Sequence, residues 1–382
     1  MEYDEKTKAA QDLIYLVSCA MNSEKPDKQK CDEMDLAAVY GLALRHSLCA
    51  VAAAALERVC VLPEDFREAK YKAVRRQSLF NIERAKVLEA LERKKIWYLP
   101  LKGIVLRNYY PKTSLREMGD NDILCDGSKT TEIKAVMEDL GFECLHFGNN
   151  NHDVYEKPPM LDFEMHRSLF ARTRHPEQYV YYENIKEKLI KDESNRYGYH
   201  MTNEDFYIYL ICHMRNHYKS RGTGLRSLLD VYVFYRRFGS DLDRAYVDPE
   251  LEKLGILEFE QGVRDLAFKV YDRRALSRSE LDELGFFIRS GSHGTLDNMM
   301  MQRLGNDDSG KAKRRYAVSR LFPPKEHVKI NHPFIYRHMA LYPLWVVYRP
   351  FKGAVRYPKK MFGEIRRLKN YKKKNSSGKY NK

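Results

Sequence analysis

The fold of this chain is decided by residues 102–126, which read KGIVLRNYYPKTSLREMGDNDILCD. The apolar run 96–101 that precedes them is rich in aromatic and branched residues and predicts a buried strand. Lys102 and Gly103 then predict a tight turn, in which backbone N–H groups approach a phosphate closely. Residues 104–110 are expected to form a short helix after this turn. The pattern is therefore strand, glycine turn and helix.

A second strand is expected over residues 121–125, and two acidic residues, Asp120 and Asp122, stand at its start. Residues two apart in an extended chain point to the same side. Two carboxylates on one face form an oxygen-only ligand pair that suits Mg²⁺ and that repels itself without a cation. An isolated Asp-x-Asp is more often a solvated turn. Here the turn before it and the apolar residues after it favour a metal site.

A third carboxylate for a two-metal site is available in residues 160–166, MLDFEMH, where apolar and polar residues alternate. This period of two predicts a strand with Asp162, Glu164 and His166 on one face. Glu164 has a large apolar residue on each side, which would hold its carboxylate rigidly. Asp162 competes for the same role but lies nearer the start of the strand. His166 is expected either to contact a phosphate or to orient Glu164.

These motifs together resemble the uncharacterised bacterial nucleotidyltransferase family with a Leu-Lys-Gly signature, in the DNA polymerase β-like nucleotidyltransferase superfamily. The matching segments are Lys102-Gly103, Arg116-x-x-x-Asp120-x-Asp122 and Phe163-Glu164-Met165-His166. The superfamily pattern is a Gly-Ser turn that opens a helix, an acid-x-acid strand and a third acid on a later strand. This sequence departs from it at the turn, where a lysine charge replaces the serine hydroxyl. Weaker similarity extends over most of the chain.

The resemblance implies an α+β fold with a small mixed β-sheet nucleotidyltransferase core and mainly helical N- and C-terminal regions. It also implies transfer of a nucleotide from an NTP such as ATP, with Mg²⁺ or Mn²⁺ as cofactor and with release of pyrophosphate. The acceptor is left open: a small molecule, a peptide or protein, or RNA. The implied catalytic and metal-binding residues are Asp120, Asp122 and Glu164. The implied nucleotide-binding residues are Lys102, Gly103, Arg116 and His166.

The rest of the chain divides by composition into four regions. They are a helical region over 1–95, the α/β core over 96–170, a helical domain over 171–310, and a basic segment over 311–382 that prolines punctuate and whose end is expected to be disordered. Hydrophobic periodicity predicts helices at 9–21, 36–59, 69–94, 130–140, 206–218, 225–238, 250–272 and 277–287, and strands at 142–147 and 152–157.

The net charge of +14 is concentrated in the last of these regions. Residues 311–382 hold 21 Lys or Arg and 2 acids, which leaves 46 basic and 51 acidic residues elsewhere. Such a segment predicts contact with a polyanion or with a membrane surface. It also supports a second interpretation, in which the chain is a non-catalytic or regulatory protein that binds nucleic acid or another anionic partner.

The seven cysteines include no Cys-x-x-Cys pair and stand mostly in apolar contexts. They predict reduced, buried thiols and a cytoplasmic protein. The acidic, polar start of the chain does not resemble a signal peptide, and no apolar stretch reaches the ~20 residues that would span a bilayer.

Three sets of polar residues outside the motifs have two interpretations each. His213 and His217 are four apart on a helix, so they form either a core or substrate-facing edge or, less favoured, a zinc site. Arg226 and Asp230 form either an i,i+4 ion pair or, again less favoured, a substrate-facing pair. His152 is expected near Glu164 through a hairpin, either as a surface residue or, less favoured, as a group that supports the acidic site.

Overall fold

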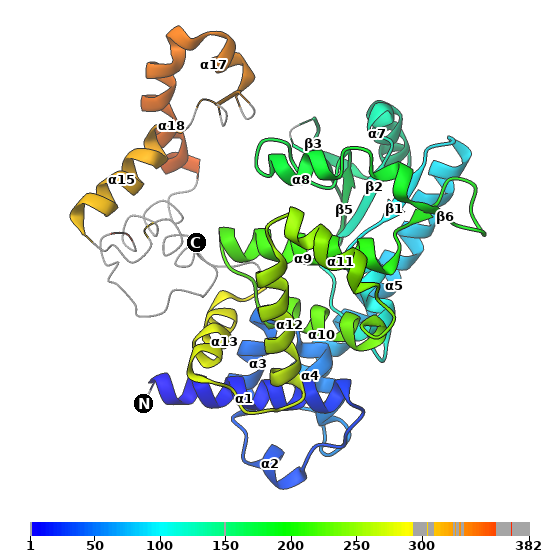
Figure 1. The fold of residues 1–382 in the computed structure, drawn as a ribbon, viewed down its shortest axis with the longest axis vertical. Coiled ribbons are helices and arrows are strands. Elements are labelled where there is room, and N and C mark those ends of the chain that lie inside the picture. The colour runs from blue at the N-terminus through cyan, green and yellow to red at the C-terminus, as the bar shows by residue number, and fades with distance from the viewer. Residues whose placement is uncertain are drawn as a thin grey trace.

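The computed structural model describes residues 2–148, 150–292, 309–323 and 332–356, and the single positions 304, 325, 328, 329 and 368. The chain folds as an α+β protein in which a mixed sheet stands beside a body of packed helices (Figure 1). The predicted fold class is confirmed. Residues 290–309, whose Gly, Ser, Asn and Asp content predicts a loop, and the expected disordered end fall largely outside the described residues.

Within the described residues, the main sheet has five strands in the order β1-β2-β5-β4-β3. They are β1 Tyr98–Pro100, β2 Asn121–Cys125, β3 Glu143–His146, β4 His152–Lys157 and β5 Leu161–His166. Strands β2 and β5 are parallel, and the other neighbouring pairs are antiparallel. All the predicted strands are confirmed. The short pair β6 Ile190–Lys191 and β7 Tyr199–His200 was not expected.

The register of the central pair gives the sheet one apolar and one acidic face. Ile123 lies beside Met165, and both pack against helices α5 Glu64–Arg93 and α7 Thr130–Asp139. Asp122 lies beside Glu164 on the opposite face. The alternation predicted for residues 160–166 therefore places the acids of both central strands on one surface.

The N-terminal region is helical, as predicted. It contains α1 Glu2–Met21, α2 Lys28–Asp32, α3 Leu36–His46, α4 Cys49–Leu56 and α5. The single helix expected over 36–59 is wrong, because Ser47 adopts a left-handed conformation with φ +53° that ends α3. Such a residue cannot continue a right-handed helix, and the chain restarts at Cys49.

The segments around the sheet are short. Between β1 and β3 they are α6 Gly103–Leu106, the 3₁₀ turns η1 Arg107–Tyr109, η2 Thr113–Leu115 and η3 Gly127–Lys129, and α7. After β5 the chain forms α8 Pro176–Tyr181, η4 Ile185–Lys188, α9 Asn203–Ser220, α10 Leu225–Phe238, α11 Arg244–Lys253, α12 Leu257–Tyr271 and α13 Arg278–Ser290. The helix expected over 250–272 is divided into α11 and α12, because Gly255 has φ +62° and terminates α11.

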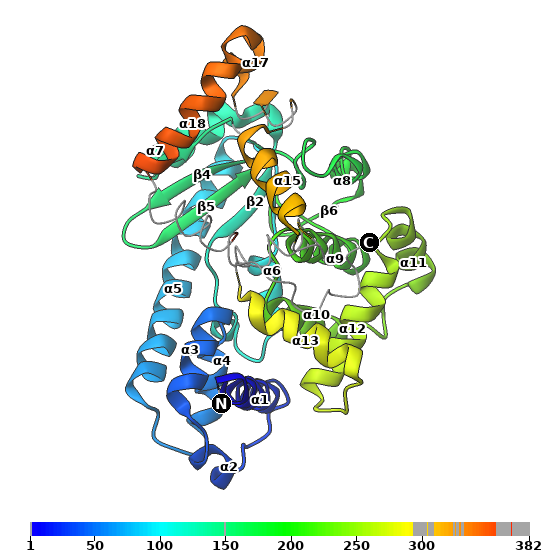
Figure 2. The ribbon, with the colours of Figure 1, turned by 90° about the vertical axis from the view of Figure 1, so that its left-hand side faces the viewer.

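The described helices of the C-terminal segment stand at one side of the molecule (Figures 1 and 2). They are α15 Gly310–Leu321, α17 Pro333–Arg337, the 3₁₀ turn η5 Met339–Leu341 and α18 Tyr342–Arg356. None of the described helices has both the length and the apolarity needed to cross a membrane.

Candidate active site

Three carboxylates converge on one face of the sheet, near the start of the inner strand β2. One oxygen atom each from Asp120, Asp122 and Glu164 lies within 4.8 Å of the others. Asp122 and Glu164 are neighbours in the parallel register of β2 and β5, and Asp120 directly precedes β2. The neighbours of Glu164 in β5, Phe163 and Met165, are 0% and 2% exposed, so the strand that carries this carboxylate is anchored in the core.

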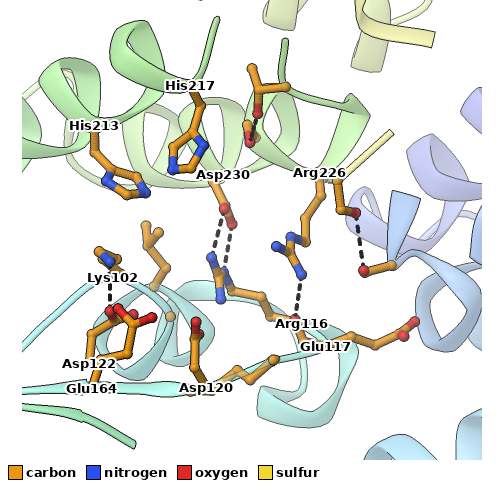
Figure 3. Close-up of a pocket in the computed structure, with 18 of the residues that line it drawn as sticks. Lys102, Arg116, Glu117, Asp120, Asp122, Glu164, His213, His217, Arg226 and Asp230 are labelled. Atoms are coloured by element: carbon orange, nitrogen blue, oxygen red, sulfur yellow. Dashed lines mark hydrogen bonds and ion pairs between the residues drawn. The ribbon is translucent and has the colours of Figure 1, made fainter. Parts of the chain in front are cut away.

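Lys102 is the cation of this acidic cluster. Its Nζ atom donates to Asp122 Oδ1 at 2.6 Å, from the turn between β1 and α6 (Figure 3). Lys102 is also the residue that turns the backbone, with φ +46° and ψ −115°, so the strained conformation lies at the lysine and not at the glycine that follows. A non-glycine residue in such a region costs on the order of 1–3 kcal/mol, and such outliers gather at functional sites. Sequence reasoning did not reveal this strain.

The charges of the cluster separate the behaviour of its two aspartates. The negative charge of Asp122 and then burial raise the pKa of Asp120 to about 6. Burial also acts to raise the pKa of Asp122, but Lys102 and His166 outweigh it and bring that pKa well below its usual range. Asp122 is therefore the ionised carboxylate at the centre of the cluster, whereas the pKa of Asp120 lies closer to neutral pH.

His166 and His152 lie beside the carboxylates. His166 Nε2 is 2.9 Å from Asp122 Oδ1 and 3.4 Å from Glu164 Oε2, and its side chain is 3% exposed. Burial lowers the pKa of His166, but its hydrogen bonds to Asp122 and Glu164 raise it above the ordinary value overall. His152 Nε2 is 3.7 Å from Glu164 Oε1, so the β4–β5 hairpin brings it to the acidic site as predicted. It is only partly exposed, which favours a supporting position over a free surface one.

Arg116, which lies in the segment before Asp120, is held in place by Asp230 of α10. Its Nε and Nη2 atoms donate to the two carboxylate oxygens of Asp230 at 2.7 and 2.8 Å, and the hydroxyl of Tyr110 donates to the same carboxylate at 2.8 Å. The two side chains of the ion pair are 9% and 6% exposed. This buried pair ties the segment that leads into Asp120 to the helical domain.

Gly103 is required by this arrangement for a steric reason. A Cβ atom at Gly103 would lie 2.4 Å from Nη1 of Arg116, closer than real side chains approach. From the sequence, this glycine was predicted to let the backbone approach a phosphate closely. The structure adds that it leaves room for the guanidinium that Asp230 holds.

The predicted ion pair between Arg226 and Asp230 is wrong. Arg226 Nη1 instead donates to the backbone oxygen of Glu117 at 2.9 Å, while Asp230 is occupied by Arg116 and Tyr110. The Glu117 carboxylate in turn accepts from the Ala50 N–H at 2.9 Å. Contacts between residues distant in sequence thus replace the local i,i+4 pair.

A pocket of about 1010 Å³ opens over the acidic cluster. His213 and His217 of α9 line the side opposite the three carboxylates, as Figure 3 shows. Burial, and then the charge of Lys102, bring the pKa of His213 well below its ordinary value, so its ring is neutral at pH 7. The two histidines therefore lie on a helix edge that faces the pocket, and neither joins a possible metal-binding group among the described residues.

The structure thus brings together every site residue that the sequence indicated: Lys102, Gly103, Arg116, Asp120, Asp122, Glu164 and His166 all line this one pocket. Tyr110 was missed, and Asp230 was considered only together with Arg226, because the residues that bind Asp230 are distant in sequence. The four-residue spacing of Arg226 and Asp230 was the one signal that pointed to α10.

No curated protein matches this chain. One similar solved structure is that of an antigenic nucleotidyltransferase-like protein from Paracoccidioides brasiliensis, with 11% identity and a TM-score of 0.34 over 51% of this chain and 94% of that one. The model of a family described as uncharacterised nucleotidyltransferase matches residues 32–272. That match includes the sheet, the acidic cluster and both walls of the pocket, and the chain belongs to this uncharacterised nucleotidyltransferase family.

Proposed function

We propose that this chain transfers a nucleotide from a Mg²⁺-bound NTP to an acceptor, with release of pyrophosphate. The observation that carries the proposal is the convergence of the Asp120, Asp122 and Glu164 carboxylates within 4.8 Å of one another in one pocket. Membership of a nucleotidyltransferase family supports the reaction class. The seven free cysteines support a reaction in the reducing cytoplasm, where NTPs are supplied.

The donor set fits the proposed cofactor. Mg²⁺ and Mn²⁺ prefer oxygen ligands, and the three carboxylates supply them. The raised pKa of Asp120, caused first by the charge of Asp122, reflects repulsion that a divalent cation would relieve. We therefore assign Asp120, Asp122 and Glu164 as ligands. When bound, the metal would offset charge on the triphosphate and favour ionisation of the acceptor.

The neighbouring residues have separate tasks in this proposal. Lys102, already beside Asp122, neutralises negative charge on the phosphates. Gly103 offers its backbone N–H without a side chain in the way. Arg116 contributes through Nη1, because its Nε and Nη2 are bound to Asp230. His166 donates to Asp122 and so keeps that carboxylate oriented, which matters because displacement by ~1 Å can cost about a hundredfold in rate.

The opposite wall of the pocket is the place for the acceptor. His213 and His217 face the carboxylates from α9, and the ring of His213 can accept a hydrogen bond from an acceptor hydroxyl. The pocket, about 1010 Å³, has room for an NTP and for part of a second molecule. A small molecule, a peptide or protein side chain, or an RNA end remains a candidate acceptor.

The second interpretation, a non-catalytic protein that binds an anionic partner, has support only from the charge of residues 311–382. It does not account for three acids gathered in a pocket, an arrangement that is costly without a cation. The transferase is therefore preferred, and the basic segment is given a separate role below.

The proposal is tested by incubation with each α-³²P-labelled NTP, Mg²⁺ and fractions of a cell extract. Wild type is compared with Asp122→Asn and with Asp139→Asn, a matched control whose carboxylate is exposed on α7. We expect one fraction to acquire label with wild type and with the control, and none with Asp122→Asn. Transfer of γ-label in place of α-label would contradict nucleotidyl transfer.

A further inference from the structure

Helix α18 turns four large apolar side chains toward solvent. Leu344, Val347, Tyr348 and Phe351 are 70%, 61%, 60% and 68% exposed. Their i, i+3, i+4, i+7 spacing places them within an arc of about 100° on one side of the helix. A continuous exposed apolar stripe of this kind marks an interaction surface.

The opposite side of α18 is already packed within its own segment. Val346 is 6% exposed, and the Trp345 ring lies 4.6 Å from that of His332. Arg349 lies over the Trp345 ring at 5.0 Å and donates to the backbone oxygen of Arg320 in α15. The helix is therefore held by one face, and the outward stripe is not the face by which it packs on the chain.

The charged residues in the sequence on both sides of the stripe are positive. Residues 327–363 contain seven Lys or Arg and no Asp or Glu. Lys352, which is exposed, directly follows Phe351 of the stripe. On α17, which contacts α18, Phe334 is likewise 63% exposed. Such a surface is complementary to an anionic bilayer, in which apolar side chains reach the acyl boundary and Lys and Arg contact headgroups.

The apolar residues distinguish this partner from nucleic acid. A polyanion in water would bind the Lys and Arg side chains and leave Leu344 and Val347 exposed to solvent. A lipid surface buries both groups at once and suits the exposed tyrosine, because tyrosine favours membrane interfaces. We propose that the stripe of Leu344, Val347, Tyr348 and Phe351 inserts into the surface of a bilayer that contains anionic lipid, and so docks the protein on a membrane.

The docking does not depend on the proposed transferase activity, and its test uses the full chain without NTP. Binding to phosphatidylcholine vesicles with and without phosphatidylglycerol is measured by co-sedimentation. Wild type is compared with Val347→Glu and with Val61→Glu, a control with the same change at a valine that is 90% exposed elsewhere. Circular dichroism checks that all three are equally folded.

We expect wild type and Val61→Glu to bind vesicles that contain phosphatidylglycerol, more weakly as salt rises, and Val347→Glu to bind at least about tenfold more weakly. Failure of wild type to bind either vesicle would overturn the proposal, and so would equal binding by Val347→Glu. If wild type bound an RNA oligonucleotide that the vesicles did not displace, the surface would be a nucleic-acid site instead.

Discussion

The carboxylate of Asp230 accepts two hydrogen bonds from Nε and Nη2 of Arg116, at 2.7 and 2.8 Å, although the two residues are 114 positions apart in the sequence. Burial disfavours the charged arginine, but Asp230 outweighs this effect and raises the pKa of Arg116 above its ordinary value. The pair joins α10 to the segment that ends in Asp120. It therefore positions part of the acidic cluster without touching it.

Replacement of Asp230 by asparagine should destabilise the fold, because it leaves the buried charge of Arg116 without its partner. The expected loss is about 3 kcal/mol in the free energy of unfolding, measured by urea denaturation. A double-mutant cycle with Arg116→Gln separates the pair from its surroundings. A coupling energy below about 0.5 kcal/mol would show that the contact is not a stabilising one.

Gly103→Ala should destabilise the fold, because the added methyl group would clash with Arg116. The new Cβ atom would stand 2.4 Å from a guanidinium nitrogen that Asp230 prevents from moving away. We expect a destabilisation of about 1–3 kcal/mol. Gly119→Ala in the same segment is the control, because nothing lies within 4 Å of a Cβ there. Equal urea midpoints for the two variants would refute the steric account.

His46 should make the fold sensitive to acid. Its Nδ1 accepts from the Leu225 N–H, its Nε2 faces the Ile288 oxygen at 3.1 Å, and burial lowers its pKa to about 4. The unfolded chain therefore takes up the proton first as the pH falls. The contribution of His46 to stability is therefore expected to be full above about pH 6.5, to decline down to about pH 4 and then to stay constant, with a loss of about 3 kcal/mol.

The measurement is the urea midpoint of wild type and His46→Gln at pH 7 and pH 5. The variant should lose less stability than wild type between the two pH values, whatever its stability at pH 7. His146→Gln, at an exposed position, should keep the wild-type dependence. An unchanged pH dependence in His46→Gln would contradict the assignment.

The sheet and the acidic cluster could be predicted from sequence because both rest on local patterns. The i, i+2 spacing of Asp120 and Asp122 and the alternation around Glu164 specify which side chains share a face. Parallel pairing of β2 and β5 then brings the acids together, because Asp122 and Glu164 are neighbours in this register.

What could not be predicted depends on contacts between distant segments or on single backbone conformations. The i,i+4 rule favoured an ion pair of Asp230 with Arg226, but Arg116 and Tyr110, more than a hundred residues away, bind Asp230 instead. The left-handed Ser47, which divides one predicted helix into two, has no compositional signal comparable to a glycine.

The choice of Glu164 over Asp162 as the third carboxylate is the central claim. Asp162 lies on the same strand, but its side chain is paired with Arg76 at 3.1 Å and stays outside the cluster. Asp162→Asn is therefore a close control for Glu164→Gln, since each removes one charge from the polar face of β5.

The most direct measurement is single-turnover transfer of α-³²P label by both variants, beside an NTP-binding assay. We predict that Glu164→Gln lowers transfer by at least about a hundredfold while NTP binding is largely kept, because Asp120 and Asp122 remain. Asp162→Asn should transfer nearly as wild type. An active Glu164→Gln together with an inactive Asp162→Asn would show that the acidic cluster described here is not the catalytic one.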